Sequence, residues 1–149
     1  MNQINTILNQ KICVIIPTYN NANTLKQVVD GVLKYNQNII LVDDGSTDNT
    51  PLILKDYDSL EIIRYDENKG KGWAIQTGFR KALSMGFDYA ITIDSDGQHF
   101  ADDILLFIEE LKKIPDSLII GSRNIEAVGM PAKNTFANKF SNFWFWAET

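Results

Sequence analysis

Short apolar runs rich in β-branched residues alternate along this sequence with longer segments whose apolar residues recur at helical spacing. This alternation is typical of a mostly parallel sheet whose strands are joined by helices packed on its two faces. It predicts a doubly wound α/β fold of three layers. The runs predicted as strands are Lys11–Ile16, Asn38–Val42, Leu60–Tyr65, Phe87–Ile93 and Ser117–Ile120.

The segments between these runs have the features of amphipathic helices. Helices are predicted around Leu25–Leu33 and over Asp48–Tyr57, Gly70–Met85, Asp102–Leu111 and Ala132–Ala147. Glycine or proline follows two of them, where each is suited to end a helix. The residues expected on the buried side of the helix over Gly70–Met85 are Trp73, Ile75, Gly78, Phe79, Ala82 and Leu83.

Composition narrows the class of protein. A length of 149 residues predicts a single domain, and 44% apolar with 22% charged residues excludes disordered and fibrous chains. Fourteen Lys and Arg against nineteen Asp and Glu leave a net charge of -5, so no nucleic-acid partner is expected. Cys13 is the only cysteine and lies in an apolar run, which predicts a buried, inert thiol in a reducing compartment.

Polar residues and glycines follow each predicted strand. Because the carboxyl ends of parallel strands meet at one edge of a sheet, these clusters are expected to form a single ligand site. They are Pro17-Thr18-Tyr19-Asn20, Asp43-Asp44-Gly45-Ser46, Asn68-Lys69-Gly70-Lys71-Gly72, Asp94-Ser95-Asp96-Gly97-Gln98-His99 and Gly121-Ser122-Arg123.

The segment Asp94-Ser95-Asp96 has the strongest chemical signal. Residues two apart in extended backbone point to the same side, so the two carboxylates would converge. Such a pair suits Mg²⁺ or Mn²⁺, which take oxygen ligands, and Gln98 offers a further amide oxygen. The alternative is an ordinary turn at a strand end, where Asp, Ser and Gly are common.

The neighbouring acids Asp43 and Asp44 leave the second predicted strand. Since neighbours in a strand point to opposite faces, one of the two is expected to face a base or a ribose hydroxyl. The alternative is that Asp43, Ser46 or Asp48 caps the following helix.

Two cationic residues are candidates for binding phosphate. Lys71 lies in a glycine-rich segment that opens a helix, where backbone N–H groups and the helix dipole favour an anion. Arg123 could pair with a diphosphate through its planar guanidinium. A solvated turn and a surface arginine are the respective alternatives.

Taken in order, these five clusters resemble the family-2 glycosyltransferases of GT-A fold, over roughly Lys11 to Arg123. Within that family the chain is most similar to dolichyl- or polyprenyl-phosphate sugar synthases. The resemblance implies a Rossmann-like, nucleotide-sugar-binding domain. It also implies metal-dependent transfer, with inversion at the anomeric carbon, from a UDP- or GDP-sugar to a polyprenyl-phosphate or saccharide acceptor.

The same resemblance assigns roles to particular positions. Asp94 and Asp96 would meet the ribose and the metal-bound diphosphate, with Gln98 as a further ligand and Arg123 beside the diphosphate or sugar. The implied catalytic residues are thus Asp94, Asp96 and Arg123, and the implied ligands of the Mg²⁺ or Mn²⁺ cofactor are Asp94, Asp96 and Gln98. The residues implied to bind the nucleotide-sugar are Pro17, Tyr19, Asn21, Val42, Asp44, Lys71 and Ser95.

Other readings of the sequence remain open. A receiver-type phosphoacceptor domain has a similar sheet, although it would place its paired acids after the first strand. A donor-binding module without transfer activity is a third reading. The aromatic stretch Phe143–Trp146 suggests a truncated chain and a surface for homo-oligomer contacts. A cytoplasmic location, with association to the inner face of the membrane if the acceptor is a lipid, is expected.

Overall fold

The computed structural model describes residues 11–115 and 117–121. The chain divides into two compact units, residues 1–117 and 118–149, and the fold described here is that of the first unit. The prediction of one domain over residues 1–149 stays a prediction. Of the second unit the structure describes residues 118–121, which form neither helix nor strand.

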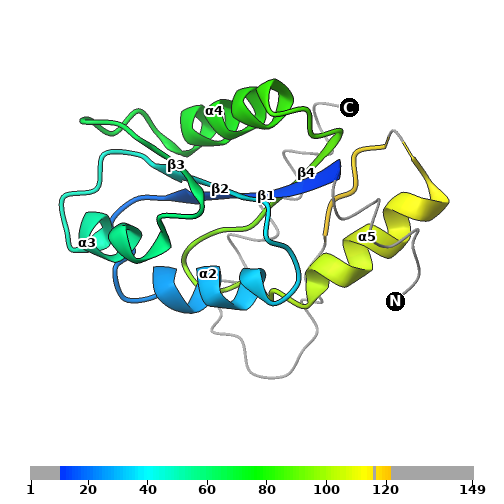
Figure 1. The fold of residues 1–149 in the computed structure, drawn as a ribbon, viewed down its shortest axis with the longest axis horizontal. Helices are drawn as coiled ribbons and strands as arrows, with labels where there is room; N and C mark the ends of the chain where they lie inside the picture. The colour runs from blue at the N-terminus through cyan, green and yellow to red at the C-terminus, as the bar shows by residue number, and fades with distance from the viewer. Residues whose placement is uncertain (1–10, 116, 122–149) are drawn as a thin grey trace, which may run out of the picture. The chain divides into compact units, whose positions relative to one another are not determined.

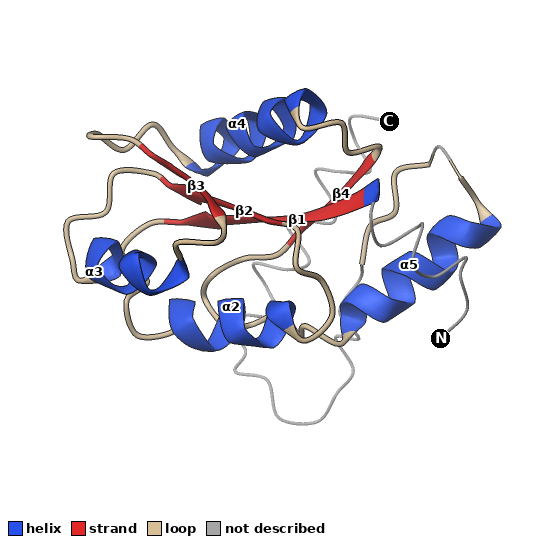
Figure 2. Ribbon diagram, viewed as in Figure 1, coloured by secondary structure: helices blue, strands red, loops and turns tan. Residues whose placement is uncertain are grey.

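A four-stranded, fully parallel sheet forms the centre of the first unit, with the strands in the order β3-β2-β1-β4. Helix α4 covers one face of the sheet, and α2 and α3 lie on the other (Figures 1 and 2). This is the predicted three-layer α/β arrangement. The strands are β1 (Ile12–Thr18), β2 (Ile39–Asp43), β3 (Glu61–Arg64) and β4 (Tyr89–Thr92).

The helices follow the predicted order along the chain. The segment predicted as a helix over Asp48–Tyr57 is a short α-helix followed by a 3-10 turn, with Pro51 in its first turn. Proline fits there because the first N–H groups of a helix have no partner inside it. The helices are α2 (Leu25–Leu33), α3 (Thr50–Leu54), the 3-10 turn η1 (Lys55–Tyr57), α4 (Lys71–Ser84) and α5 (Asp103–Lys113).

Strands β1 and β2 are buried along their whole length, as expected for central strands covered on both faces. Helix α4 packs on them through its small residues Ala74, Gly78 and Ala82. A Cβ added at Gly78 would collide with the side chain of Ile15 in β1. The close approach of α4 to the sheet therefore depends on the small size of these side chains.

The prediction for the buried side of α4 was partly wrong. Gly78 and Ala82 are buried as predicted, whereas Trp73, Phe79 and Leu83 are exposed. When a helix approaches a sheet closely through small residues, its bulky neighbours on adjacent positions are directed to the sides of the contact. Helical spacing of apolar residues does not distinguish these two arrangements.

The predicted fifth strand is also absent from the described residues. Ser117–Ile120 has no strand structure, and the side chains of Leu118 and Ile120 are 84% and 61% exposed. An apolar run becomes a strand only by pairing with a neighbouring strand, and no described strand pairs with this segment. The helix predicted over Ala132–Ala147 and the aromatic stretch Phe143–Trp146 lie outside the described residues.

The Cys13 side chain is buried in β1, as predicted, and it contacts the core beneath α4. Burial raises the pKa of its thiol to about 11, because the thiolate would lose its hydration. The thiol is therefore neutral and unreactive near pH 7. None of the helices within the described ranges has the length and apolar character needed to cross a bilayer.

Candidate active site

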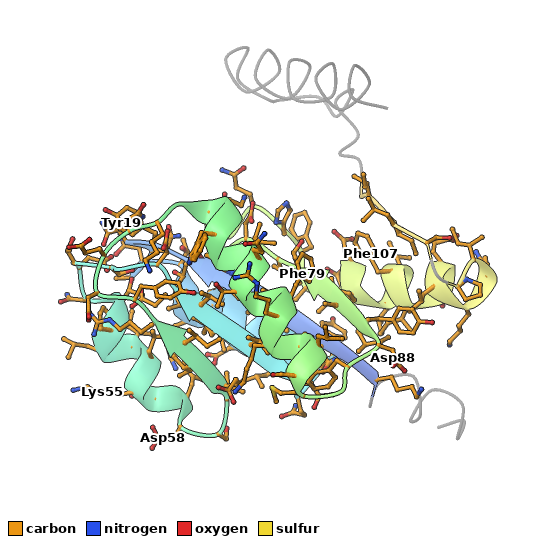
Figure 3. The ribbon with its side chains drawn as sticks, turned by 90° about the horizontal axis from the view of Figure 1, so that it is seen from above. Tyr19, Lys55, Asp58, Phe79, Asp88 and Phe107 are labelled. Carbon is orange, nitrogen blue, oxygen red and sulfur yellow. The ribbon has the colours of Figure 1, made fainter. Side chains whose placement is uncertain are left out.

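A cavity of about 210 Å³ lies at the carboxyl ends of β1, β2 and β4. Figure 3 shows Tyr19 at this end of the sheet and Asp88, which precedes β4, at the opposite end. Most of the predicted site residues therefore come together, as the topology of a parallel sheet leads one to expect. The cavity is lined by Pro17, Thr18, Tyr19, Asn21, Asp44, Lys71, Ala74, Asp94, Ser95 and Asp96.

The two acids after β4 both reach this cavity. Asp94 forms an ion pair with Lys71, whose Nζ lies 2.7 Å from Asp94 Oδ2. Asp96 Oδ1 accepts a hydrogen bond of 2.8 Å from the backbone N–H of Gln98. The loop after β4 thus brings two carboxylates to the cavity, and the Lys71 ammonium group partly neutralises that of Asp94.

Ser95, between the two acids, ties this loop to the loop after β1. Its buried hydroxyl donates to the carbonyl oxygen of Pro17 over 3.0 Å and accepts from Asn21 Nδ2 over 2.7 Å. The Ser95 carbonyl oxygen accepts a third hydrogen bond, of 2.6 Å, from the Thr24 hydroxyl. Ser95 and Asn21 both line the cavity, and their contact with the nucleotide stays a prediction; in the structure they also hold in place the backbone that carries Asp94 and Asp96.

Asp44 is the acid of its pair that reaches the cavity, as preferred from the resemblance. Its carboxylate is already engaged, because Oδ1 accepts from the N–H of Lys69 over 2.9 Å and Oδ2 from that of Gly70 over 2.7 Å. Charge-assisted bonds of this kind are stronger than neutral ones. Asp44 therefore anchors the loop that leads into α4, whatever contact it also makes with a ligand.

Gly45 brings the same loop close to the end of β2. It has φ +76°, and a Cβ at this position would lie 2.6 Å from the backbone of Glu67 and Asn68. Glycine is required here both by the conformation and by the space. The loop that positions Lys71 is thus fixed by one carboxylate and one close backbone contact.

The alternative that an acid after the second strand has a structural role, and not a ligand-binding one, applies to Asp43 and Asp48. Asp43 Oδ1 accepts from the Ser46 N–H, and its Oδ2 lies 3.2 Å from Arg64 Nε. Asp48 accepts from the N–H groups of Thr50, at the start of α3, and of Ala22. Burial would raise the pKa of Asp48, but these hydrogen bonds outweigh it and lower the pKa. Both acids stabilise the turn after β2.

Two predicted residues do not line the cavity, and the position of a third is not described. Val42 is fully buried in the core beneath α4, so the side chain is not available to a base or ribose. Gln98 is exposed and does not line the cavity, and Arg123 lies outside the described residues. Conversely, Ala74 lines the cavity without having been predicted, and Thr18, which belongs to the predicted cluster after the first strand, lines it although it was given no role of its own.

The side chains at the cavity suit a divalent ion whose coordination shell is completed by the substrate. Within residues 11–115 and 117–121, no group of three or more His, Cys, Asp or Glu side chains is close enough to hold a metal by itself. Of the three carboxylates that line the cavity, Asp44 already accepts from two backbone N–H groups, so Asp94 and Asp96 are the two that suit a metal ion. Mg²⁺ is usually held in this way, by one or two carboxylates together with substrate phosphates and water.

The chain was compared with known proteins. Residues 13–138 match the model of the family described as Glycosyl transferase family 2. The chain is 38% identical over 129 residues to UDP-N-acetylglucosamine--dolichyl-phosphate N-acetylglucosaminyltransferase of Methanococcus voltae, which covers 75% of this chain and 51% of that protein. It is 32% identical over 123 residues to polyprenol monophosphomannose synthase of Mycolicibacterium smegmatis, covering 78% and 46% of the two chains.

A solved structure is also similar. The structure of TarS residues 1–349 from S. aureus has a TM-score of 0.59 and 26% sequence identity, and the match covers 81% of this chain and 38% of that one. The chain spans about half the length of the curated relatives that it matches.

Proposed function

Because this chain belongs to glycosyl transferase family 2, we propose that it binds a nucleoside-diphosphate sugar at the cavity beyond β1, β2 and β4 and takes part in transferring the sugar. The donor is a UDP- or GDP-sugar, and Mg²⁺ or Mn²⁺ is the cofactor. The observation that carries the proposal is the convergence of Asp94, Asp96 and Lys71 on one cavity, from the loop after β4 and from the start of α4.

The charges at the cavity suit the diphosphate of such a donor. Asp94 and Asp96 would hold the divalent ion, and Lys71 would contact a phosphate oxygen. The Lys71 side chain leaves the first turn of α4, where the helix dipole also favours an anion. Tyr19, which is half exposed at the rim, offers an aromatic face to the base. Arg123 is proposed to lie beside the diphosphate or the sugar.

The size of the cavity agrees with only part of a donor being enclosed. Sites for small molecules usually have volumes of about 300–1,000 Å³, whereas this cavity measures about 210 Å³. The described residues thus provide room for a portion of the nucleotide-sugar. The acceptor side of the site is not assigned to any of them.

The transfer step requires charge neutralisation above all. The anomeric C–O bond to the diphosphate breaks as the acceptor oxygen attacks the opposite face of the sugar, so the reaction inverts that carbon. Negative charge develops on the leaving diphosphate, and Lys71 is placed to stabilise it. The bound divalent ion supplies further Lewis-acid stabilisation of that charge.

A lipid phosphate is the acceptor that we favour. The two relatives described above are named for dolichyl-phosphate and for a polyprenol product, which supports a polyprenyl phosphate over a saccharide. A phosphate acceptor is already anionic, so the reaction needs no general base to activate it. A saccharide hydroxyl would need one. Association with the inner face of a membrane follows for a lipid acceptor.

Thermal shift tests donor binding directly. UDP or GDP is expected to raise the melting temperature only when Mn²⁺ or Mg²⁺ is present, because ligand binding stabilises the folded state by mass action. Asp96→Asn should abolish the shift, whereas Asp58→Asn, at an exposed position after η1, should keep it. The proposal would be refuted if UDP and GDP both left the melting temperature unchanged in the presence of Mn²⁺ and of Mg²⁺.

The two remaining readings predict different results. A donor-binding module would show the metal-dependent shift, but with a nucleotide-sugar and polyprenyl phosphate it would form no polyprenyl-phosphate sugar and release no nucleoside diphosphate. A receiver domain would be modified by acetyl phosphate and would ignore UDP and GDP. The acids of this chain follow β2 and β4, and a receiver would place its paired acids after β1.

A further inference from the structure

The Lys71–Asp94 ion pair spans the cavity between two elements that the proposed function uses. Lys71 is the first residue of α4 and Asp94 follows β4, and Nζ lies 2.7 Å from Oδ2. The lysine side chain is 61% exposed and that of the aspartate 27%. Exposed pairs of this kind contribute little to stability and break readily. The pair can therefore open without disturbing the fold.

We propose that the ammonium group of Lys71 pairs with Asp94 until a divalent ion and a diphosphate bind together, and that it then moves to pair with the diphosphate. This inference rests on the proposed function. An ammonium group at 2.7 Å occupies Oδ2 of Asp94, and its charge repels a second cation nearby. Binding of the metal alone is therefore opposed by Lys71.

The diphosphate removes this penalty because it offers Lys71 a new anionic partner. The flexible stem of a lysine allows its ammonium group to move between neighbouring acceptors without a change in the backbone. Metal and nucleotide should consequently strengthen one another's binding, by the same factor in both directions. The ion pair thus favours the complete metal–nucleotide complex over binding of the metal by itself.

Lys69 provides a matched control in the same loop. Its Nζ lies 4.8 Å from the centre of the Tyr65 ring and 5.6 Å from that of Trp73, so this ammonium group contacts aromatic rings, whereas the ion pair with Asp94 is formed by Lys71. Its backbone N–H, which Asp44 binds, survives a change of side chain. Lys69→Met therefore removes an equal charge two residues away while leaving Asp94 and the loop anchor in place.

The test measures Mn²⁺ binding to the full chain, either by calorimetry or from the electron spin resonance signal of free Mn²⁺. Lys71→Met should bind Mn²⁺ alone about 2- to 5-fold more tightly than the unmodified protein, since an exposed ion pair no longer competes. In saturating Mn²⁺ the same variant should bind UDP or GDP about tenfold more weakly, because a charge-assisted contact is lost. Lys69→Met should change neither affinity by as much as twofold.

Several outcomes are decisive. Unchanged or weaker Mn²⁺ binding by Lys71→Met would overturn the inference while the proposed function stands. Tighter Mn²⁺ binding without weaker nucleotide binding would overturn the transfer of Lys71 to the diphosphate. If neither the unmodified protein nor Lys71→Met bound Mn²⁺, the proposed metal site would itself be wrong. Equal effects of Lys71→Met and Lys69→Met would show that the loss of any positive charge in this loop has the same effect, and would overturn a specific role for Lys71.

Discussion

At the scale of single residues, the acids at and just after the carboxyl ends of β2 and β4 divide into two groups by what they contact. Asp43 and Asp48 bind backbone groups of the turn after β2. Asp94 and Asp96 line the cavity, and Asp94 pairs with a lysine there. Asp44 belongs to both groups, because it lines the cavity while both its oxygens bind backbone N–H groups. Replacing one acid therefore tests either anchoring or ligand binding.

Asp44→Asn tests whether the Asp44 carboxylate anchors the loop that leads into α4. The amide has one accepting oxygen, and its NH₂ group would face the N–H of Lys69 or Gly70, leaving a partly buried donor without a partner. We expect a loss of about 1–3 kcal/mol in the free energy of unfolding and a loss of the nucleotide-dependent thermal shift. Urea denaturation measures the first and a melting curve the second. A variant as stable as the unmodified protein would show that the loop is anchored elsewhere.

Asp48 should make stability depend on pH in the acid range. Its pKa is lowered in the folded protein, since hydrogen bonds to the carboxylate outweigh the opposing effect of burial. The stabilisation is therefore complete above the unfolded-state pKa of about 3.9. It is lost as pH falls through the lower, folded-state value. Urea denaturation between pH 6 and pH 2.5 should show the difference between the unmodified protein and Asp48→Asn shrinking with acidification; a constant difference would contradict the assignment.

At the scale of elements, α4 links the core to the site. Its small residues Ala74, Gly78 and Ala82 pack on the sheet, and Lys71 at its start lines the cavity. The distance between helix and sheet therefore sets the position of Lys71. Asp44 and Gly45 hold the loop before the helix from the other side. A change in the packing of α4 should be felt at the cavity.

Substitutions at two glycines of α4 distinguish the effect of packing on stability from that of helix propensity. Gly78→Ala adds a methyl group where Ile15 already lies, and we expect it to lower the free energy of unfolding by about 1–3 kcal/mol. Gly72→Ala adds the same group where no atom lies within 4 Å, so helix propensity should make it neutral or stabilising by up to about 1 kcal/mol. Thermal and urea denaturation of both variants would check this. Equal effects would mean that α4 does not pack closely at Gly78.

At the scale of the first unit, stability should be greatest in the central strands. β1 and β2 are buried throughout, whereas β3 and β4 are only partly buried and lie at the two edges of the described sheet. Opening of a local segment requires exposure of its buried contacts, so central strands open only with global unfolding.

Hydrogen exchange followed by mass spectrometry measures this gradient. Amides of Ile12–Thr18 and Ile39–Asp43 should exchange last, and those of Glu61–Arg64 and Tyr89–Thr92 should exchange earlier. Metal with UDP or GDP should slow exchange in the loops at the carboxyl ends of the strands. Edge strands as slow as the central ones would show that the edges are covered in solution.

The sequence by itself determined the order and type of the described elements and the clustering of polar residues at the strand ends. It did so because periodicity and turn residues act over a few neighbouring positions, and because parallel strands bring their carboxyl ends together. The run Ser117–Ile120 marks the limit of this reasoning. Its composition suits a strand, but whether it is one depends on a partner strand.

Only the tertiary structure decided how the site is held. Ser95 binds Pro17 across 78 positions in the chain, Asp44 binds Gly70 across 26, and Lys71 pairs with Asp94 across 23. No local pattern fixes contacts between positions so far apart, since they follow from how closely the elements pack. For the same reason the motif Asp94-Ser95-Asp96 indicated two converging carboxylates, while the lysine already bound to one of them could be recognised only in the folded chain.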